Sequence, residues 1–255
     1  MMKLWRTLRR KPPSDRELFQ RHFGDFPPEF EAIHQAVKPD TKISRMGVFA
    51  NLEAISYVCR NGIKGAVVET GVWRGGSVKA MLLQLLALGD TSRDVYLFDT
   101  FAGMTAPSAT DVALEGEELR SAWEAQQRAA HNEWCFAPLE DVEAVLATTA
   151  YPPDRVHFVV GDVRRTVPET APTMGPIAVL RLDTDWYEST KVEIEHLYDL
   201  LAPGGVLIID DYARWEGQRR AIDAFFEDRG FHPFLYRIAP GKRLAIKPGD
   251  PLGAR

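Results

Sequence analysis

The spacing of apolar positions changes about a quarter of the way along the chain. Up to Gly62 they recur at helical intervals, which predicts three short helices, the third with Val48, Leu52 and Ile55 on one face. Beyond this point, short apolar runs alternate with helical stripes. Near-continuous apolar strands are typical of a parallel sheet whose two faces are covered by helices, so the pattern predicts an α/β fold.

Seven runs are predicted to form the strands of this sheet. The five parallel strands are expected at residues 66–70, 95–99, 156–160, 176–184 and 205–210. Residues 234–238 and 243–246 are expected to close the sheet as an antiparallel hairpin with Pro240 and Gly241 in its turn. The prediction is a Rossmann-like, mostly parallel, seven-stranded sheet preceded by N-terminal helices.

The chain is expected to form one structural domain. Residues 1–62 form a helical segment, and residues 63–255 form the ligand-binding domain. A long insertion at residues 104–150, rich in Ala, Glu and Gln, follows the second strand and is expected to contain two helices. Its length and its place at the ligand edge of the sheet predict a lid that, with the N-terminal helical segment, covers the substrate.

Composition narrows the class of protein. The 255 residues are 45% hydrophobic and 26% charged, which is typical of a soluble globular domain. The net charge of −5 argues against a nucleic-acid-binding protein that relies on a basic face. Cys59 and Cys135 lack metal-type spacing, which favours a reduced, cytoplasmic protein. The basic N-terminus has no apolar stretch behind it, so no membrane span is expected.

A glycine-rich turn follows the first predicted strand. Gly71 permits a tight turn, and Gly75 lets the start of the next helix lie close to a ligand. The spacing is not Gly-x-Gly-x-x-Gly, which counts against a dinucleotide. Asp99, at the end of the second strand, is placed to bind ribose hydroxyls or to cap a turn. Asp162, after the third strand, could contact an adenine amino group or begin a turn.

These features describe a nucleoside pocket without a phosphate clamp. S-adenosylmethionine fits such a pocket, because it contains adenosine, carries no phosphate, and has a cationic sulfonium suited to acidic surroundings. The residues predicted to bind it are Glu69, Thr70, Gly71, Gly75, Ser77, Asp99, Thr100, Asp162 and Val163.

Two acidic pairs end two adjacent buried strands. Asp183 and Asp185 follow the fourth strand, and Asp210 and Asp211 follow the fifth. Carboxylates gathered at one sheet edge repel, and a divalent cation removes that repulsion. Hard oxygen ligands favour Mg²⁺, Mn²⁺ or Ca²⁺. Each acid alone could instead cap a helix.

Four stretches together resemble the metal-dependent macrocin O-methyltransferase family, which has the class I methyltransferase fold. They are Glu-Thr-Gly-Val-Trp-Arg-Gly-Gly at 69–76, Leu-Phe-Asp-Thr-Phe-Ala-Gly at 97–103, and residues 180–190 and 208–212. The resemblance runs from about Ser44 to Ile246. It implies that Asp183, Asp210 and Asp211 bind Mg²⁺ and that Asp185 is the general base. Thr184, Trp186 and Ala213 depart from the pattern that we expect for the family.

The predicted function is metal-dependent methyl transfer from S-adenosylmethionine to a hydroxyl of a sugar or a glycosylated natural product. The family resemblance further implies an acceptor with a vicinal diol. Trp186 and Tyr187 could shape the sugar pocket, and Lys191 is an alternative base. A nicotinamide-dependent oxidoreductase and a non-catalytic nucleoside-binding protein are the alternative functions. The sequence leaves a homo-oligomer open.

Overall fold

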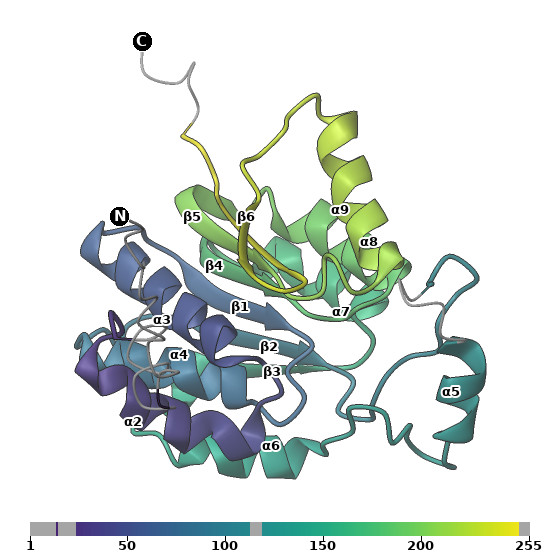
Figure 1. The fold of residues 1–255 in the computed structure, drawn as a ribbon, viewed down its shortest axis with the longest axis horizontal. Helices are drawn as coiled ribbons and strands as arrows, with labels where there is room; N and C mark the ends of the chain where they lie inside the picture. Colours follow the sequence, from purple (N-terminus) through teal and green to yellow (C-terminus); the bar gives the residue numbers. More distant parts are fainter. Residues whose placement is uncertain (1–13, 15–23, 113–118, 250–255) are drawn as a thin grey trace, which may run out of the picture.

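The computed structural model describes residues 14, 24–112 and 119–249. A seven-stranded sheet crosses it in the order β3-β2-β1-β4-β5-β7-β6 (Figure 1). The strands are β1 (Ala66–Thr70), β2 (Val95–Asp99), β3 (Val156–Val160), β4 (Ile177–Leu182), β5 (Leu201–Ile209), β6 (Tyr236–Ala239) and β7 (Lys242–Ile246). All neighbours pair in parallel except β5 with β7 and β6 with β7. The predicted sheet with its antiparallel C-terminal hairpin is therefore confirmed.

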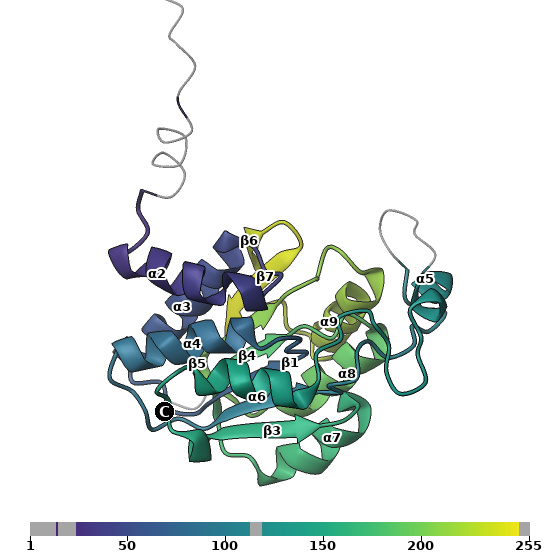
Figure 2. The ribbon, with the colours of Figure 1, turned by 90° about the horizontal axis from the view of Figure 1, so that it is seen from below.

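Helices cover both faces of the sheet. They are α2 (Pro28–Val37), α3 (Arg45–Arg60), α4 (Gly76–Ala87), α5 (Leu119–Ala125), α6 (Leu139–Ala147), α7 (Val163–Thr170), α8 (Tyr187–Leu197) and α9 (Glu216–Asp228). One apolar core joins α3, α4 and α6 to the sheet, and a second joins α7, α8 and α9 to the opposite face (Figure 2). The apolar stripes of these six helices are thus buried, as their spacing predicts.

The strand boundaries differ from the prediction by one or two residues in the C-terminal hairpin, where β6 begins at Tyr236 rather than at residue 234. Two further differences occur in β4 and β5. β5 begins at Leu201 rather than at residue 205, because Leu201 already pairs with Ile177 before the register shifts. β4 ends at Leu182, since Asp185 has a positive φ of 70° that no strand accommodates. The second and third predicted helices are present as α2 and α3, whereas the first lies outside the described residues.

The insertion after β2 is attached to the carboxyl ends of the strands. The backbone N–H of Tyr187 donates to Asp111 Oδ1 at 2.7 Å, and Trp186 Nε1 donates to the carbonyl of Thr105 at 2.8 Å. Its helix α5 projects beyond these strand ends, while α6 packs on α4 (Figure 1). The insertion therefore lies where a parallel α/β sheet binds its ligands.

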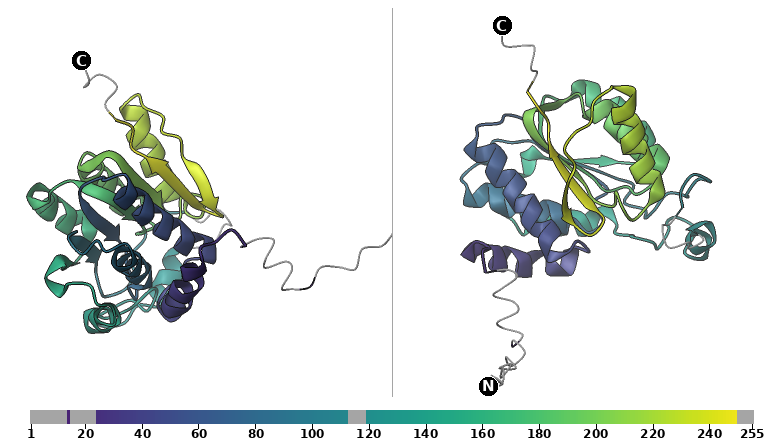
Figure 3. Two further views of the ribbon diagram at one scale, coloured as in Figure 1. Left: turned by 90° about the vertical axis from the view of Figure 1, so that its left-hand side faces the viewer. Right: turned by 45° about the horizontal axis from the view of Figure 1, so that its top comes forward.

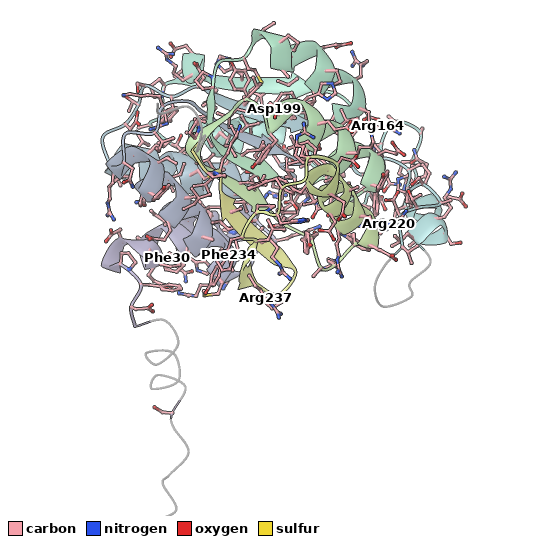
Figure 4. All side chains as sticks on the ribbon, turned by 90° about the horizontal axis from the view of Figure 1, so that it is seen from above. Phe30, Arg164, Asp199, Arg220, Phe234 and Arg237 are labelled. Carbon is pink, nitrogen blue, oxygen red and sulfur yellow. The ribbon has the colours of Figure 1, made fainter. Side chains whose placement is uncertain are left out.

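The C-terminal hairpin lies beside the N-terminal helices. β6 contacts α3, so segments from the two ends of the described chain pack together (Figure 3). Phe234, which precedes β6, is 83% exposed, and Arg237 lies on β6 nearby (Figure 4). Among the described residues, no helix is both long enough and apolar enough to span a bilayer.

Candidate functional site

A cavity of about 260 Å³ lies at the carboxyl ends of β1, β2, β4 and β5. It brings together most of the residues that the sequence predicts to bind a methyl donor: Glu69, Gly71, Ser77, Asp99, Thr100, Asp162 and Val163. Thr70 is fully buried and Gly75 packs against Val142, and neither lines the cavity. All four aspartates of the two acidic pairs line it as well, so the predicted donor and metal residues share one cavity.

Asp99 organises the glycine-rich turn. Its Oδ2 accepts from the backbone N–H of Val72 at 2.8 Å and of Trp73 at 3.2 Å, and its Oδ1 accepts from that of Phe101 at 2.8 Å. Burial raises the pKa of the Asp99 carboxyl, although these three hydrogen bonds act in the opposite direction. Asp99 thus holds the turn and also faces the cavity.

A hydrogen-bond chain connects β1 to the N-terminal helices. Ser77 Oγ donates to Glu69 Oε2 at 2.9 Å and accepts from Asn51 Nδ2 at 2.9 Å. Burial raises the pKa of Glu69 to about 7, despite the charge of Arg181 beside it. This chain fixes the Glu69 carboxyl where it lines the cavity.

Asp162 caps helix α7. Its Oδ1 accepts from the backbone N–H of Arg164 at 2.9 Å, and the Arg164 guanidinium pairs with the same carboxylate at 2.5 Å. Asp162 therefore has the structural role given as its alternative, since it begins the turn into α7. Asp162 also lines the cavity, so a contact with adenine stays a prediction.

Three of the four aspartates converge. One carboxylate oxygen each from Asp183, Asp185 and Asp211 lie within 4.8 Å of one another. Burial and the neighbouring carboxylates raise the pKa of Asp185 well above its ordinary value, and burial likewise raises that of Asp183. Asp185 Oδ1 is buried without a hydrogen-bond partner among the described residues. Such a set of oxygen donors fits a hard divalent cation. The cation would offset the repulsion between the buried carboxylates and would give Asp185 Oδ1 a partner.

Asp210 points to two basic side chains instead. Arg181 Nη2 donates to its Oδ1, and Lys242 Nζ donates to its Oδ2. Burial would raise the pKa of Asp210, but these two cations more than offset burial and lower it. Asp210 and Asp211 directly follow β5, and their side chains diverge: Asp210 contacts Arg181 and Lys242, whereas Asp211 belongs to the acidic cluster.

Arg181 and Lys242 are site residues that the sequence analysis did not identify. Arg181 is 1% exposed, and its Nη1 also donates to Glu69 Oε1 at 2.5 Å and to Asp183 Oδ2 at 2.8 Å. An arginine inside an apolar run that ends in acids could have indicated this role. Lys242 comes from β7, and its sequence surroundings carry no comparable signal.

The aromatic residues around the cavity differ from those expected. Trp134 and Trp215 line it, whereas Trp186 and Tyr187 do not. Trp186 is 3% exposed and packs edge-on against Trp215, with ring centroids 5.6 Å apart. It therefore supports the wall from behind. Lys191, the alternative base, pairs with Glu195 at 2.8 Å and lies outside the cavity lining.

Comparisons with known proteins agree with this geometry. The model of the macrocin O-methyltransferase family (TylF) matches residues 39–240. The chain is 42% identical over 159 residues to the 8-demethyl-8-(2,3-dimethoxy-alpha-L-rhamnosyl)-tetracenomycin-C 4'-O-methyltransferase of Streptomyces olivaceus, covering 62% of this chain and 57% of that protein. It is 35% identical over 160 residues to the mycinamicin III 3''-O-methyltransferase of Micromonospora griseorubida, covering 62% and 59%. These matches span less than two thirds of the length of either relative.

Solved structures show the same architecture. The O-methyltransferase NovP superposes with a TM-score of 0.71 at 27% identity, covering 82% of this chain and 83% of NovP. The calicheamicin methyltransferase CalS11 superposes with a TM-score of 0.64 at 19% identity, covering 92% and 93%, which supports the fold alone. The class I methyltransferase fold is confirmed, and the chain belongs to the macrocin O-methyltransferase family.

Proposed function

From membership of this family, we propose that the protein transfers a methyl group from S-adenosylmethionine to a hydroxyl of a sugar or a glycosylated natural product, with a divalent cation. One observation carries the proposal. The glycine turn and Asp99 line the same cavity as the convergent carboxylates of Asp183, Asp185 and Asp211. A donor pocket and a site that activates a hydroxyl must adjoin for direct methyl transfer.

The donor is proposed to lie along the ends of β1, β2 and β3. Asp99 would accept from the ribose hydroxyls, and Asp162 would accept from the adenine amino group. Acidic side chains outnumber basic ones in the cavity lining, and the resulting negative charge suits the sulfonium. A phosphate-bearing cofactor would meet this same negative charge, which disfavours the nicotinamide-dependent oxidoreductase.

Asp183, Asp210 and Asp211 are proposed to hold the cation. Asp183 and Asp211 already contribute oxygens to the cluster, whereas Asp210 becomes available only when Lys242 Nζ releases its Oδ2. When bound, Mg²⁺ or a similar ion would lower the pKa of an acceptor hydroxyl.

Asp185 is proposed as the general base. It lies two residues beyond Asp183, and its φ of 70° turns the chain back toward the acid cluster. Burial and the neighbouring carboxylates raise the pKa of Asp185, and a cation bound beside it would counter this effect and favour the ionised form. Its unpartnered Oδ1 could then accept the proton that the acceptor hydroxyl loses as its oxygen attacks the methyl carbon. In-line attack then displaces S-adenosylhomocysteine, and the chain's task is to position the reacting atoms.

The acceptor is proposed to be a sugar with neighbouring hydroxyls. The name of one relative identifies a rhamnosyl-bearing tetracenomycin as its substrate, and the name of a second identifies mycinamicin III. Trp134 and Trp215 offer aromatic surface in the cavity on which an apolar sugar face can pack. A vicinal diol would present two oxygens to the cation at once.

Two measurements test this function. Calorimetry with S-adenosylhomocysteine and with NAD should show binding of the first alone, and the opposite result would favour an oxidoreductase. Radiolabelled donor should then transfer methyl to rhamnosides in a panel of glycosides. A non-catalytic nucleoside-binding protein would bind the donor product without any transfer. For an acceptor found in this way, the analogue that lacks the neighbouring hydroxyl should show a much lower kcat/KM, and an equal value would exclude the diol.

A further inference from the structure

The segment between α2 and α3 lies against the glycine-rich turn. A Cβ on Gly76 would overlap the backbone carbonyl of Asp40, so only glycine permits this approach. The Asp40 carboxylate lies 3.5 Å from Arg74 Nε and 3.7 Å from Lys79 Nζ, and these ion pairs hold the segment in place. The next residues, including Lys42, therefore line the cavity beside the turn.

Lys42 differs from the other lysine and the buried arginine around this cavity. Arg181 and Lys242 are both ion-paired with carboxylates. Within the described part of the chain, Lys42 has no ion pair with a carboxylate. Its Nζ donates to Cys135 Sγ at 3.3 Å and lies 4.4 Å from the centroid of the Trp73 ring. A thiol and an aromatic face are weak partners for an ammonium group at an exposed position.

The proposed donor supplies a stronger partner. At neutral pH, S-adenosylmethionine contains one anionic group, the carboxylate of its methionine part. Asp99 and Asp162 account for the adenosine end in the proposed function, and no group has yet been assigned to this carboxylate. Most ionisable side chains around the cavity are acidic and would repel it. Arg214 also lines the cavity without an ion pair to a described carboxylate, but its guanidinium lies over the Trp215 ring, at 5.2 Å from the centroid, in the segment that follows Asp211. Lys42 is the available cation beside the glycine turn, where the donor is proposed to bind.

We propose that Lys42 binds the methionine carboxylate of the methyl donor. On binding, its Nζ exchanges the Cys135 thiol for a charge-assisted hydrogen bond to the carboxylate. Trp73 stays beneath the lysine stem and limits its positions. This inference rests on the proposed function, because it assigns one further contact to the same donor.

The test compares two ligands that differ in the amino-acid part. S-adenosylhomocysteine contains the carboxylate, and 5′-methylthioadenosine lacks the amino-acid end. By calorimetry, Lys42→Met should weaken binding of S-adenosylhomocysteine about tenfold, as expected for one charge-assisted contact, and leave methylthioadenosine unchanged. Lys42→Arg should retain most of the affinity, because arginine also pairs with carboxylates.

Two further variants serve as controls for the effect of Lys42→Met. Lys38→Met removes the same charge from a neighbouring exposed position outside the cavity lining, and it should leave both affinities unchanged. Asp99→Ala should weaken both ligands, because the ribose is common to them. Thermal melts of each variant check folding, and the exposed position of Lys42 makes a stable variant the expected result.

Either of two results would overturn the assignment. In the first, Lys42→Met binds S-adenosylhomocysteine as well as the unchanged protein does. In the second, the variant loses the same factor for both ligands, which would place Lys42 near the adenosine or in a structural role. Failure of the proposed function is distinguishable, since the unchanged protein would then bind neither ligand.

Discussion

Lys242 Nζ donates to a carboxylate oxygen of Asp210, so a side chain from the C-terminal hairpin lies inside the acidic site. The two residues are 32 positions apart and are 8% and 5% exposed. In this arrangement, the lysine occupies an oxygen that the family resemblance assigns to a metal ion. The ammonium group and a divalent cation therefore compete for Asp210.

Lys242→Met should raise the affinity for Mn²⁺ or Mg²⁺, because it removes both the competing donor and a like charge. Two unit charges 4 Å apart interact by about 1–4 kcal/mol between water and a protein surface, so a gain of roughly tenfold is expected. Calorimetric titration of the ion into the protein measures it. Lys191→Met, which removes a charge outside the cavity, is the matched control. A lower affinity in Lys242→Met would mean that the lysine supports the site rather than competing in it.

Asp185→Asn should lower kcat by about 10²–10⁴-fold, because the amide cannot accept the proton from the acceptor hydroxyl. The affinity for S-adenosylhomocysteine should stay the same, since Asp185 lies outside the proposed donor contacts. Steady-state kinetics and calorimetry on the same preparation separate the two effects. A near-normal kcat would transfer the role of base to water. A loss of cation affinity instead would identify Asp185 as a ligand, as its place in the cluster also permits.

Glu193 holds the loop after β4, which carries Asp183 and Asp185. It is fully buried on α8, and its Oε1 accepts from Thr184 Oγ1 at 2.7 Å, between Asp183 and Asp185. Burial raises its pKa from 4.5 to about 7. Between these two values, the unfolded chain releases the proton while the folded chain keeps it. The free energy of unfolding therefore falls as the pH rises from about 4.5 to about 7, and the loss is then complete.

Glu193→Gln should remove this part of the pH dependence and keep an acceptor for Thr184. Relative to the variant, the unchanged protein should lose on the order of 3 kcal/mol of stability between pH 4.5 and 7. Urea unfolding at pH 5 and at pH 8 measures the difference. Glu195→Gln, at an exposed position on the same helix, should follow the unchanged protein. Parallel pH profiles for Glu193→Gln and the unchanged protein would show that folding does not raise the pKa of Glu193.

Local sequence patterns predicted the sheet and the position of the site. Apolar runs placed β1, β2 and β3 at their observed boundaries, because each strand is mostly apolar and is bounded by charged residues or glycine. Both acidic pairs are predicted at one edge, since the ends of neighbouring parallel strands lie there, and three of the four aspartates do converge. Asp210, a predicted metal ligand, instead pairs with Arg181 and Lys242. The start of β5 at Leu201 was missed because Pro203 and Gly204 interrupt the pattern, although the pairing with Ile177 begins before them.

The partners of these residues required the three-dimensional structure. Lys242 reaches Asp210 from an antiparallel strand that no local pattern connects to β5. Trp134 enters the cavity from the insertion, and Trp186, which follows the proposed base directly, turns away to bond with Thr105. Such contacts depend on how distant segments pack, and they cannot be predicted from the spacing of residues along the chain.

The most direct test of cation-dependent methyl transfer measures transfer from radiolabelled S-adenosylmethionine to an accepted glycoside before and after removal of divalent ions. The protein with excess chelator should lose turnover, and added Mg²⁺ should restore it. Its affinity for S-adenosylhomocysteine should change little under chelation, which shows that the protein stays folded. Turnover that continues undiminished in excess chelator would contradict the claim that Asp183, Asp210 and Asp211 hold a cation needed for the reaction.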